Sequence, residues 1–219
     1  MQKLGEILAA AGIVGIPLLL FSVLSIALIA ERLTFWYRVN RRQNKVVREA
    51  LALYREDPRL AQEKLERNMD LPVPRIFLEA MALEDAEPDE FALAIDGAIQ
   101  AEITVIKRFN NVFDTIVTIS PLLGLLGTVL GLIRSFSALD LGNVGGTETI
   151  GVTAGISEAL VSTAFGLVVA LFTLLFANTF RGFYLGQLAL IQEYSAQLEL
   201  LYRRHRKQTK EVAYAAPRS

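Results

Sequence analysis

Residues 149–180 read TIGVTAGISEALVSTAFGLVVALFTLLFANTF, and this stretch decides the fold class. It holds a single charged residue, Glu158, in 32 positions. A helix of about 20 apolar residues crosses the hydrocarbon core of a bilayer, so the stretch predicts a transmembrane helix. Two further runs without any charge are long enough to do the same, 7–30 and 115–133. We therefore expect an all-α membrane protein with three transmembrane helices.

The overall composition excludes several classes of protein. Of the 219 residues 53% are hydrophobic and 21% charged, and the net charge is −1. A chain so close to neutral is not typical of a nucleic-acid binder, and we expect the lipid bilayer to be its surroundings instead. Cysteine is absent, which excludes disulfides, thiolate metal sites and cysteine nucleophiles, and the single histidine, His205, lies in a basic tail. No spacing of metal ligands, no Ser/His/Asp set and no phosphate loop is recognisable, so we expect no enzyme, metal or cofactor.

The distribution of lysine and arginine predicts how the chain is oriented in the membrane. Thirteen of these residues lie in 31–114 and seven lie from Arg181 onward. Lys3 alone precedes the first run, and Arg134 alone lies in the connection after the second. Positive charge stays on the cytoplasmic side of a membrane. The N-terminus is therefore expected in the periplasm and the C-terminus in the cytoplasm of a bacterial inner-membrane protein.

This orientation predicts six segments along the chain. In order they are a transmembrane helix at 1–30, a cytoplasmic helical segment at 31–114, a transmembrane helix at 115–135, a short periplasmic connection at 136–148, a transmembrane helix at 149–180, and a cytoplasmic C-terminal helix and tail at 181–219. Apolar residues recur at helical spacing in both cytoplasmic segments. We see no breaker between Pro88 and the second span and expect one helix from about Pro88 to Ile133. From about Lys207 we expect disorder.

Small residues gather on one side of each of the last two spans. On a helical wheel those of the second span lie within about 120°, and they are Ser120, Gly124, Gly127, Thr128 and Gly131. The third span carries a similar arc beside Glu158, formed by Gly155, Ala159, Ser162, Thr163 and Gly166. Such faces let helix backbones approach closely. The simpler interpretation is packing between helices, and the alternative is the wall of a crowded pore.

The acid in the third span asks for a functional explanation. If the span begins near Thr149, Glu158 lies about 13 Å below the outer edge of the hydrocarbon. An ionised carboxylate there costs at least about 2.5–3.5 kcal/mol. Glu158 must therefore take up a proton, or it must face water or a partner. This position predicts a proton relay, and the alternative is a static acid that is hydrogen-bonded to Ser162, to Thr163 or to a neighbouring hydroxyl.

Two motifs give the chain a family resemblance. PLLGLLGTVLGLIRSF (121–136), followed by GISEALVSTAFGLVVA (155–170), resembles the ExbB/TolQ/MotA proton-channel family, and specifically its ExbB/TolQ branch. The resemblance implies an inner-membrane proton-channel and motor subunit that couples the proton-motive force to work on a partner protein, in outer-membrane import or envelope integrity. Glu158 matches the essential membrane glutamate of the family, and Thr163 and Thr128 match its pore-lining threonines.

The same resemblance implies an assembly. Five copies would form a bundle whose second and third spans surround a central pore. The implied partners are an ExbD/TolR-like single-span protein with a membrane aspartate and a TonB- or TolA-like protein. Glu158 and Thr163 are about 140° apart on an ideal helix, so Glu158 faces either the pore or a subunit interface. Ton-type, Tol-type and other systems driven by the proton-motive force stay open, as does a non-conducting helical scaffold that assembles a transport complex.

Overall fold

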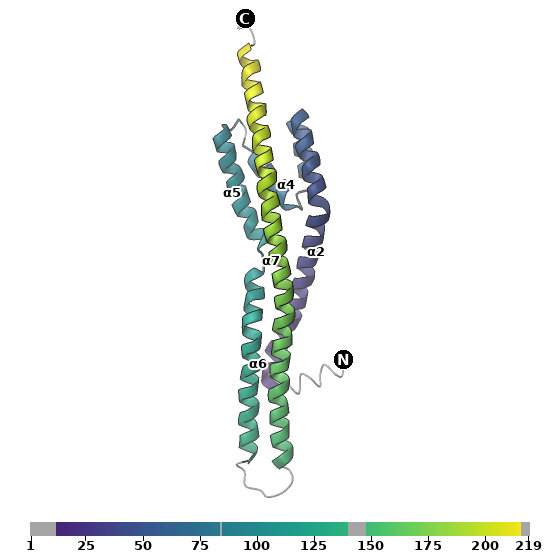
Figure 1. Ribbon diagram of the computed structural model, residues 1–219, viewed down its shortest axis with the longest axis vertical. Coiled ribbons are helices and arrows are strands. Elements are labelled where there is room, and N and C mark those ends of the chain that lie inside the picture. Colours follow the sequence, from purple (N-terminus) through teal and green to yellow (C-terminus); the bar gives the residue numbers. More distant parts are fainter. Residues whose placement is uncertain (1–11, 84, 140–147, 216–219) are drawn as a thin grey trace. The chain divides into compact units, whose positions relative to one another are not determined.

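The computed structural model describes residues 12–83, 85–139 and 148–215, and nearly all of them are helical. No strand occurs in these three ranges. The helices, shown in Figure 1, are α2 (Gly12–Glu56), α3 (Pro58–Glu66), α4 (Pro72–Met81), α5 (Pro88–Ile106), α6 (Asn110–Leu139) and α7 (Glu148–Ala215). The expected all-α class is therefore confirmed.

The chain divides into two compact units, each built from segments that are distant in the sequence. The first unit is formed by Met1–Arg32 and Phe109–Phe180, and the second by Leu33–Arg108 and Arg181–Ser219. Among the described residues, three helices are long and apolar enough to cross a membrane. The described residues of the three predicted spans all fall in the first unit, which we call the membrane unit. We call the second the extramembrane unit.

In the membrane unit, α6 and the first half of α7 lie side by side and antiparallel (Figure 1). Glycines on both helices allow the close approach. A Cβ atom added to Gly166 would lie 2.5 Å from the carbonyl oxygen of Ser120, and one added to Gly131 would lie 2.6 Å from that of Gly155. Carbon and oxygen atoms that are not bonded do not approach so closely. The two backbones are therefore in contact, as small-residue faces allow.

The predicted continuous helix from Pro88 to Ile133 is wrong. The helix α5 ends at Ile106 and α6 begins at Asn110. Phe109, between them, has a φ of 70°, in the left-handed region that an α-helix cannot contain. This residue ends the helix in the way that glycine commonly does. Because Phe109 is neither glycine nor proline, the residue type at this position does not predict a break in the helix.

The ends of α6 and α7 also differ from the predicted segment boundaries. Disorder from about Lys207 is wrong, since α7 continues to Ala215. The helix α6 extends to Leu139 and α7 begins at Glu148, so both enter the predicted connection at 136–148. Residues 140–147 of that connection, and the beginning of the first span, lie outside the described residues.

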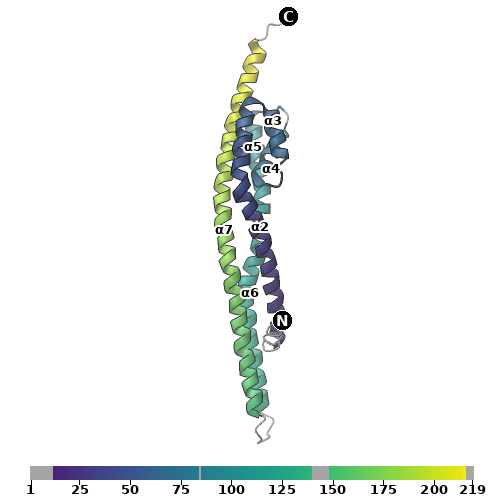
Figure 2. The same cartoon turned by 90° about the vertical axis from the view of Figure 1, so that its right-hand side faces the viewer.

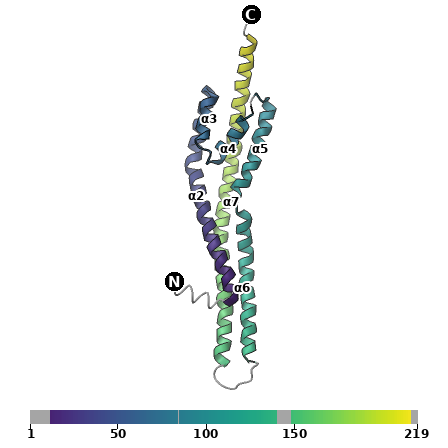
Figure 3. The same ribbon diagram turned by 180° about the vertical axis from the view of Figure 1, so that it is seen from behind.

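In the extramembrane unit, short helices pack in chain order. The helix α3 packs on α4, and α4 packs on α5 (Figures 2 and 3). Each of the three begins with a proline in its first turn, where the missing N–H is not needed. Asp57 caps α3, because its Oδ1 accepts a hydrogen bond of 2.8 Å from the backbone N–H of Arg59. Local sequence thus determines where these helices start.

Aromatic stacking and a partly buried ion pair connect the helices of this unit. The rings of Phe91 and Tyr202 are stacked, with centroids 3.8 Å apart. The hydroxyl of Tyr202 donates to the carbonyl oxygen of Ala86 at 2.6 Å. The Nε of Arg75 donates to Glu102 at 3.0 Å, and Glu102 is only 7% exposed. Burial raises the pKa of Glu102, and the guanidinium of Arg75 opposes that rise.

Candidate functional site

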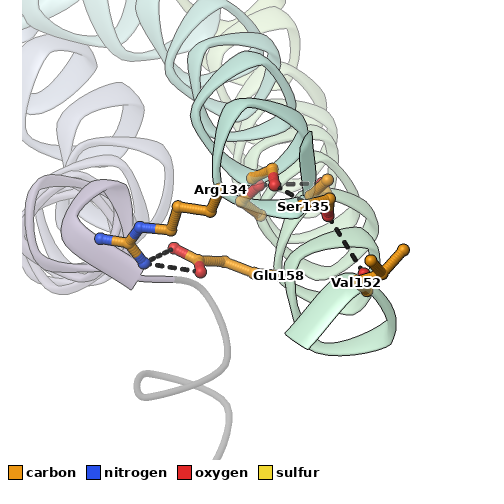
Figure 4. Close-up of polar contacts among 7 residues, drawn as sticks. Arg134, Ser135, Val152 and Glu158 are labelled. Carbon is orange, nitrogen blue, oxygen red and sulfur yellow. Dashed lines mark hydrogen bonds and ion pairs between the residues drawn. The ribbon is translucent and has the colours of Figure 1, made fainter. Parts of the chain in front are cut away.

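The spans in α6 and α7 contain one charged residue each, and the two residues form an ion pair. Arg134 is the single charge in 115–139, and Glu158 is the single charge in 149–180. Figure 4 shows the guanidinium of Arg134 reaching from α6 to the carboxylate of Glu158 on α7. Its Nη1 donates to Oε1 at 2.8 Å and to Oε2 at 2.7 Å. The acid therefore carries its counter-charge within the same chain, and the pair as a whole is neutral.

The two partners differ in their exposure. The side chain of Glu158 is 16% exposed and that of Arg134 is 51% exposed. A half-exposed guanidinium is not compatible with a hydrocarbon environment, because charged groups in lipid are strongly disfavoured. Arg134 must therefore face water, lipid headgroups or another protein, while the acid beneath it is mostly covered. The pair thus joins a half-exposed base to a mostly covered acid.

The first residue of α2 covers one side of the carboxylate. Gly12 has a φ of 60°, and a Cβ added there would lie 1.6 Å from Oε1 of Glu158. The φ favours glycine, because other residues are strained at such a value, and a side chain added here would displace the carboxylate. Glu158 is thus enclosed by the beginning of α2, by Arg134 of α6 and by its own helix.

The residue after Arg134 holds the helices in register at this height. The Oγ of Ser135 lies 3.1 Å from the carbonyl oxygens of both Gly131, on its own helix, and Val152, on α7 (Figure 4). A Cβ added to Gly155 would lie 2.2 Å from the same Oγ. The backbone that carries Arg134 is therefore fixed against α7. What can move at this site is the long side chain of Arg134.

The two threonines of the predicted proton pathway make other contacts. Thr163 Oγ1 donates to the carbonyl oxygen of Gly124 at 2.9 Å and so joins α7 to α6. Thr128 Oγ1 donates to Leu125 at 2.6 Å within its own helix. The structure thus gives Glu158, Thr163 and Thr128 separate partners within the chain. Their participation in one pathway stays a prediction.

The predicted small-residue faces of the two spans meet each other inside one chain. A Cβ added to Gly127 would lie 2.2 Å from Oγ of Ser162, and one added to Gly131 would lie 2.9 Å from Cβ of Ala159. A Cβ on Gly124 would lie 3.0 Å from Cα of Thr163. The members of this interface are Ser120, Gly124, Gly127 and Gly131 on α6 and Gly155, Ala159, Ser162 and Gly166 on α7. A role of these residues in a pore wall stays a prediction.

The hydroxyl partners considered for a static acid are occupied elsewhere. Ser162 Oγ donates to the carbonyl oxygen of Ala159, and Thr163 Oγ1 donates to Gly124. The alternative that Glu158 is held by these hydroxyls is therefore wrong, because its partner is Arg134. Within the described ranges, no group of three or more His, Asp or Glu side chains is placed to hold a metal ion.

Sequence reasoning missed two residues of this site, Arg134 and Gly12. A signal for Arg134 was present, since it lies about 80° from Gly124 on the helical wheel, at the edge of the small-residue face. It is also the single charge of its span and opposite in sign to Glu158. We know of no such signal for Gly12, because its role depends on a positive φ and on a contact between distant segments.

With this geometry described, comparison with known proteins decides the family. Residues 43–193, well over half of the chain, match the model of the MotA/TolQ/ExbB proton channel family. The chain belongs to this family. It is 58% identical over 209 residues to the putative biopolymer transport protein ExbB-like 3 of Synechocystis sp., an alignment that covers 95% of the chain and 100% of the relative.

More distant relatives indicate the branch. The chain is 37% identical over 193 residues to the putative biopolymer transport protein ExbB-like 1 of the same organism, covering 88% of the chain and 76% of the relative. It is 32% identical over 102 residues to the Tol-Pal system protein TolQ of Haemophilus influenzae, covering 43% and 44%. The predicted ExbB/TolQ branch is confirmed. The chain is a multi-pass inner-membrane protein of a family that couples the proton-motive force to work and is not a known class of enzymes.

Proposed function

We propose that this chain is the channel subunit of an inner-membrane motor and that Glu158 transfers the protons that drive it. The observation that carries the proposal is the pairing of Glu158, the single charge in residues 149–180 of α7, with Arg134, the single charge in residues 115–139 of α6. Ionisable groups within membrane spans mark ion pathways and proton relays. The acid is mostly buried, yet its partner is half exposed, so the site lies where protons can arrive from water.

The proposal includes an assembly and an orientation. The N-terminus is periplasmic and the C-terminus cytoplasmic, as the distribution of lysine and arginine indicates. Several copies, five by the resemblance to the family, surround a pore to which Glu158, Thr163 and Thr128 contribute. An ExbD/TolR-like single-span protein with a membrane aspartate accepts the proton in the pore. A TonB- or TolA-like protein transmits the work to biopolymer transport or to envelope maintenance.

A charge-neutral substitution at the acid tests this function. Glu158→Gln keeps the size of the side chain and can still hydrogen-bond to Arg134, but it cannot titrate. We expect the variant to insert and assemble normally and to lose activity in a cellular assay of uptake or envelope integrity that depends on the proton-motive force. Glu158→Asp should retain part of the activity. The matched control is Glu193→Gln, which neutralises an exposed acid of α7 outside the apolar stretch. Full activity of Glu158→Gln would refute the proposal.

A static scaffold is the second candidate, and one observation favours it. The ion pair and the close packing of α6 on α7 are also what a rigid, non-conducting assembly needs. In that case the pair contributes to stability alone, and Glu158→Gln keeps its activity as long as it folds. The same experiment therefore separates the two functions.

A further inference from the structure

The ion pair raises a question about proton transfer. A carboxylate that relays protons must be open to a proton arriving from water. In the lone chain both oxygens of Glu158 accept hydrogen bonds from Arg134, and Gly12 covers Oε1 from another side. An arriving proton therefore meets a carboxylate whose two oxygens already accept hydrogen bonds from the guanidinium of Arg134.

Arg134 cannot transfer the proton itself. A guanidinium keeps its proton throughout the physiological range, so it offers no step in a relay. Its positive charge has the opposite effect, because an arginine beside a conduction path is an electrostatic barrier to protons and other cations. The position of Arg134 suits such a barrier, since its side chain is half exposed and lies over a mostly buried acid.

The structure also indicates which part of the site opens. Ser135 and Gly155 fix the backbone next to Arg134 against α7. Opening by separation of the two helices would break this contact. The arginine side chain has several rotatable bonds and is half exposed, so it can leave the carboxylate without moving the helix.

We propose that Arg134 is a gating residue, which keeps the chain closed to protons by occupying Glu158 until the assembled motor draws the guanidinium away. This inference rests on the proposed function, since it takes Glu158 as the relay. Arg134 itself acts through Glu158 and is a positioning residue.

The test measures proton flux into liposomes that contain this chain alone. A potassium gradient with valinomycin drives protons inward, and a pH-sensitive dye inside reports them. We expect low flux for the wild type and about a tenfold rise for Arg134→Gln, as expected when a barrier falls by one charge-assisted contact. Arg134→Lys should show the low flux of the wild type, because it keeps the positive charge. The control is Ser137→Ala, an exposed position of α6 whose hydroxyl bonds only to its own helix.

A double variant shows whether the leak passes through the acid. Arg134→Gln combined with Glu158→Gln should return to low flux. Three results would overturn the inference. One is a leak that persists in the double variant, and another is equal flux in Arg134→Gln and the wild type. The third is a leak in Arg134→Lys as large as that in Arg134→Gln. Arg134→Met, similar in length and uncharged, serves as a second variant. Loss of folded protein in both Arg134→Gln and Arg134→Met would show that Arg134 is needed for folding, and would also overturn its proposed role as a gate.

Failure of the gate and failure of the proposed function have different signatures. If Glu158→Gln keeps full activity in the cellular assay, the relay is refuted and the gate with it. If Glu158→Gln is inactive but Arg134→Gln does not leak, the relay stands and the gate alone is refuted.

Discussion

Replacing Gly166 with alanine tests the close packing of α7 on α6, which positions the ion pair. The added Cβ would lie 2.5 Å from the carbonyl oxygen of Ser120 and 3.1 Å from Cα of Gly124. Both are backbone atoms, so no side chain can rotate out of the way. Ordinary van der Waals contact begins near 3.4 Å, so the carbonyl must move by about 0.9 Å. Overpacking of this kind costs about 1–3 kcal/mol.

The matched control is Gly182→Ala, in the same helix, where an added Cβ has no atom within 4 Å. Alanine is favoured over glycine inside a helix by up to about 1 kcal/mol, so this variant should equal or exceed the wild type in stability. The assay is the free energy of unfolding in detergent micelles, followed by circular dichroism during denaturant titration. Equal stability of Gly166→Ala and Gly182→Ala would refute the packing of α6 on α7 at this position.

Two further predictions concern the acids of the two units. Gly12→Ala should displace the carboxylate of Glu158 and impose about 1–2 kcal/mol of backbone strain. Activity driven by the proton-motive force should therefore fall in this variant. The control is Gly97→Ala, where an added Cβ has open space around it, and this variant should keep the wild-type activity. In the extramembrane unit, burial raises the pKa of Glu102, so its contribution to stability is present at low pH and is lost as the pH rises through that raised pKa. The stability of the wild type relative to Glu102→Gln should therefore fall as the pH rises above about 4.3, the ordinary pKa of a glutamate. Parallel pH profiles of the two proteins would contradict this.

Composition and periodicity predicted the elements of this fold well, because membrane spans consist of long runs of uncharged residues that are visible in the sequence. They did not predict the break between α5 and α6. A left-handed φ at Phe109 has no residue-type signal, since such a φ is uncommon for any residue other than glycine. The full length of α7 was not predicted either, since the helix continues past Lys207, where we expect disorder, as far as Ala215.

The candidate site could be predicted in part. Glu158 was recognisable because an acid inside an apolar span is rare and costly. Its pairing with Arg134 was not, because a helical wheel gives the direction of a side chain but not its height relative to a neighbouring helix. That height depends on the register of α6 against α7, which is fixed by contacts such as Ser135 with Val152. Counting Arg134 as a charge of the connection concealed its position within the last turns of α6.

Proton flux in liposomes that contain this chain together with an ExbD/TolR-like partner tests the central claim most directly. The wild type, Glu158→Asp and Glu158→Gln are compared at equal amounts of assembled complex. We predict that flux is high for the wild type, reduced for Glu158→Asp and abolished for Glu158→Gln, because protons pass through this carboxylate. Flux at the wild-type rate in Glu158→Gln would contradict the account.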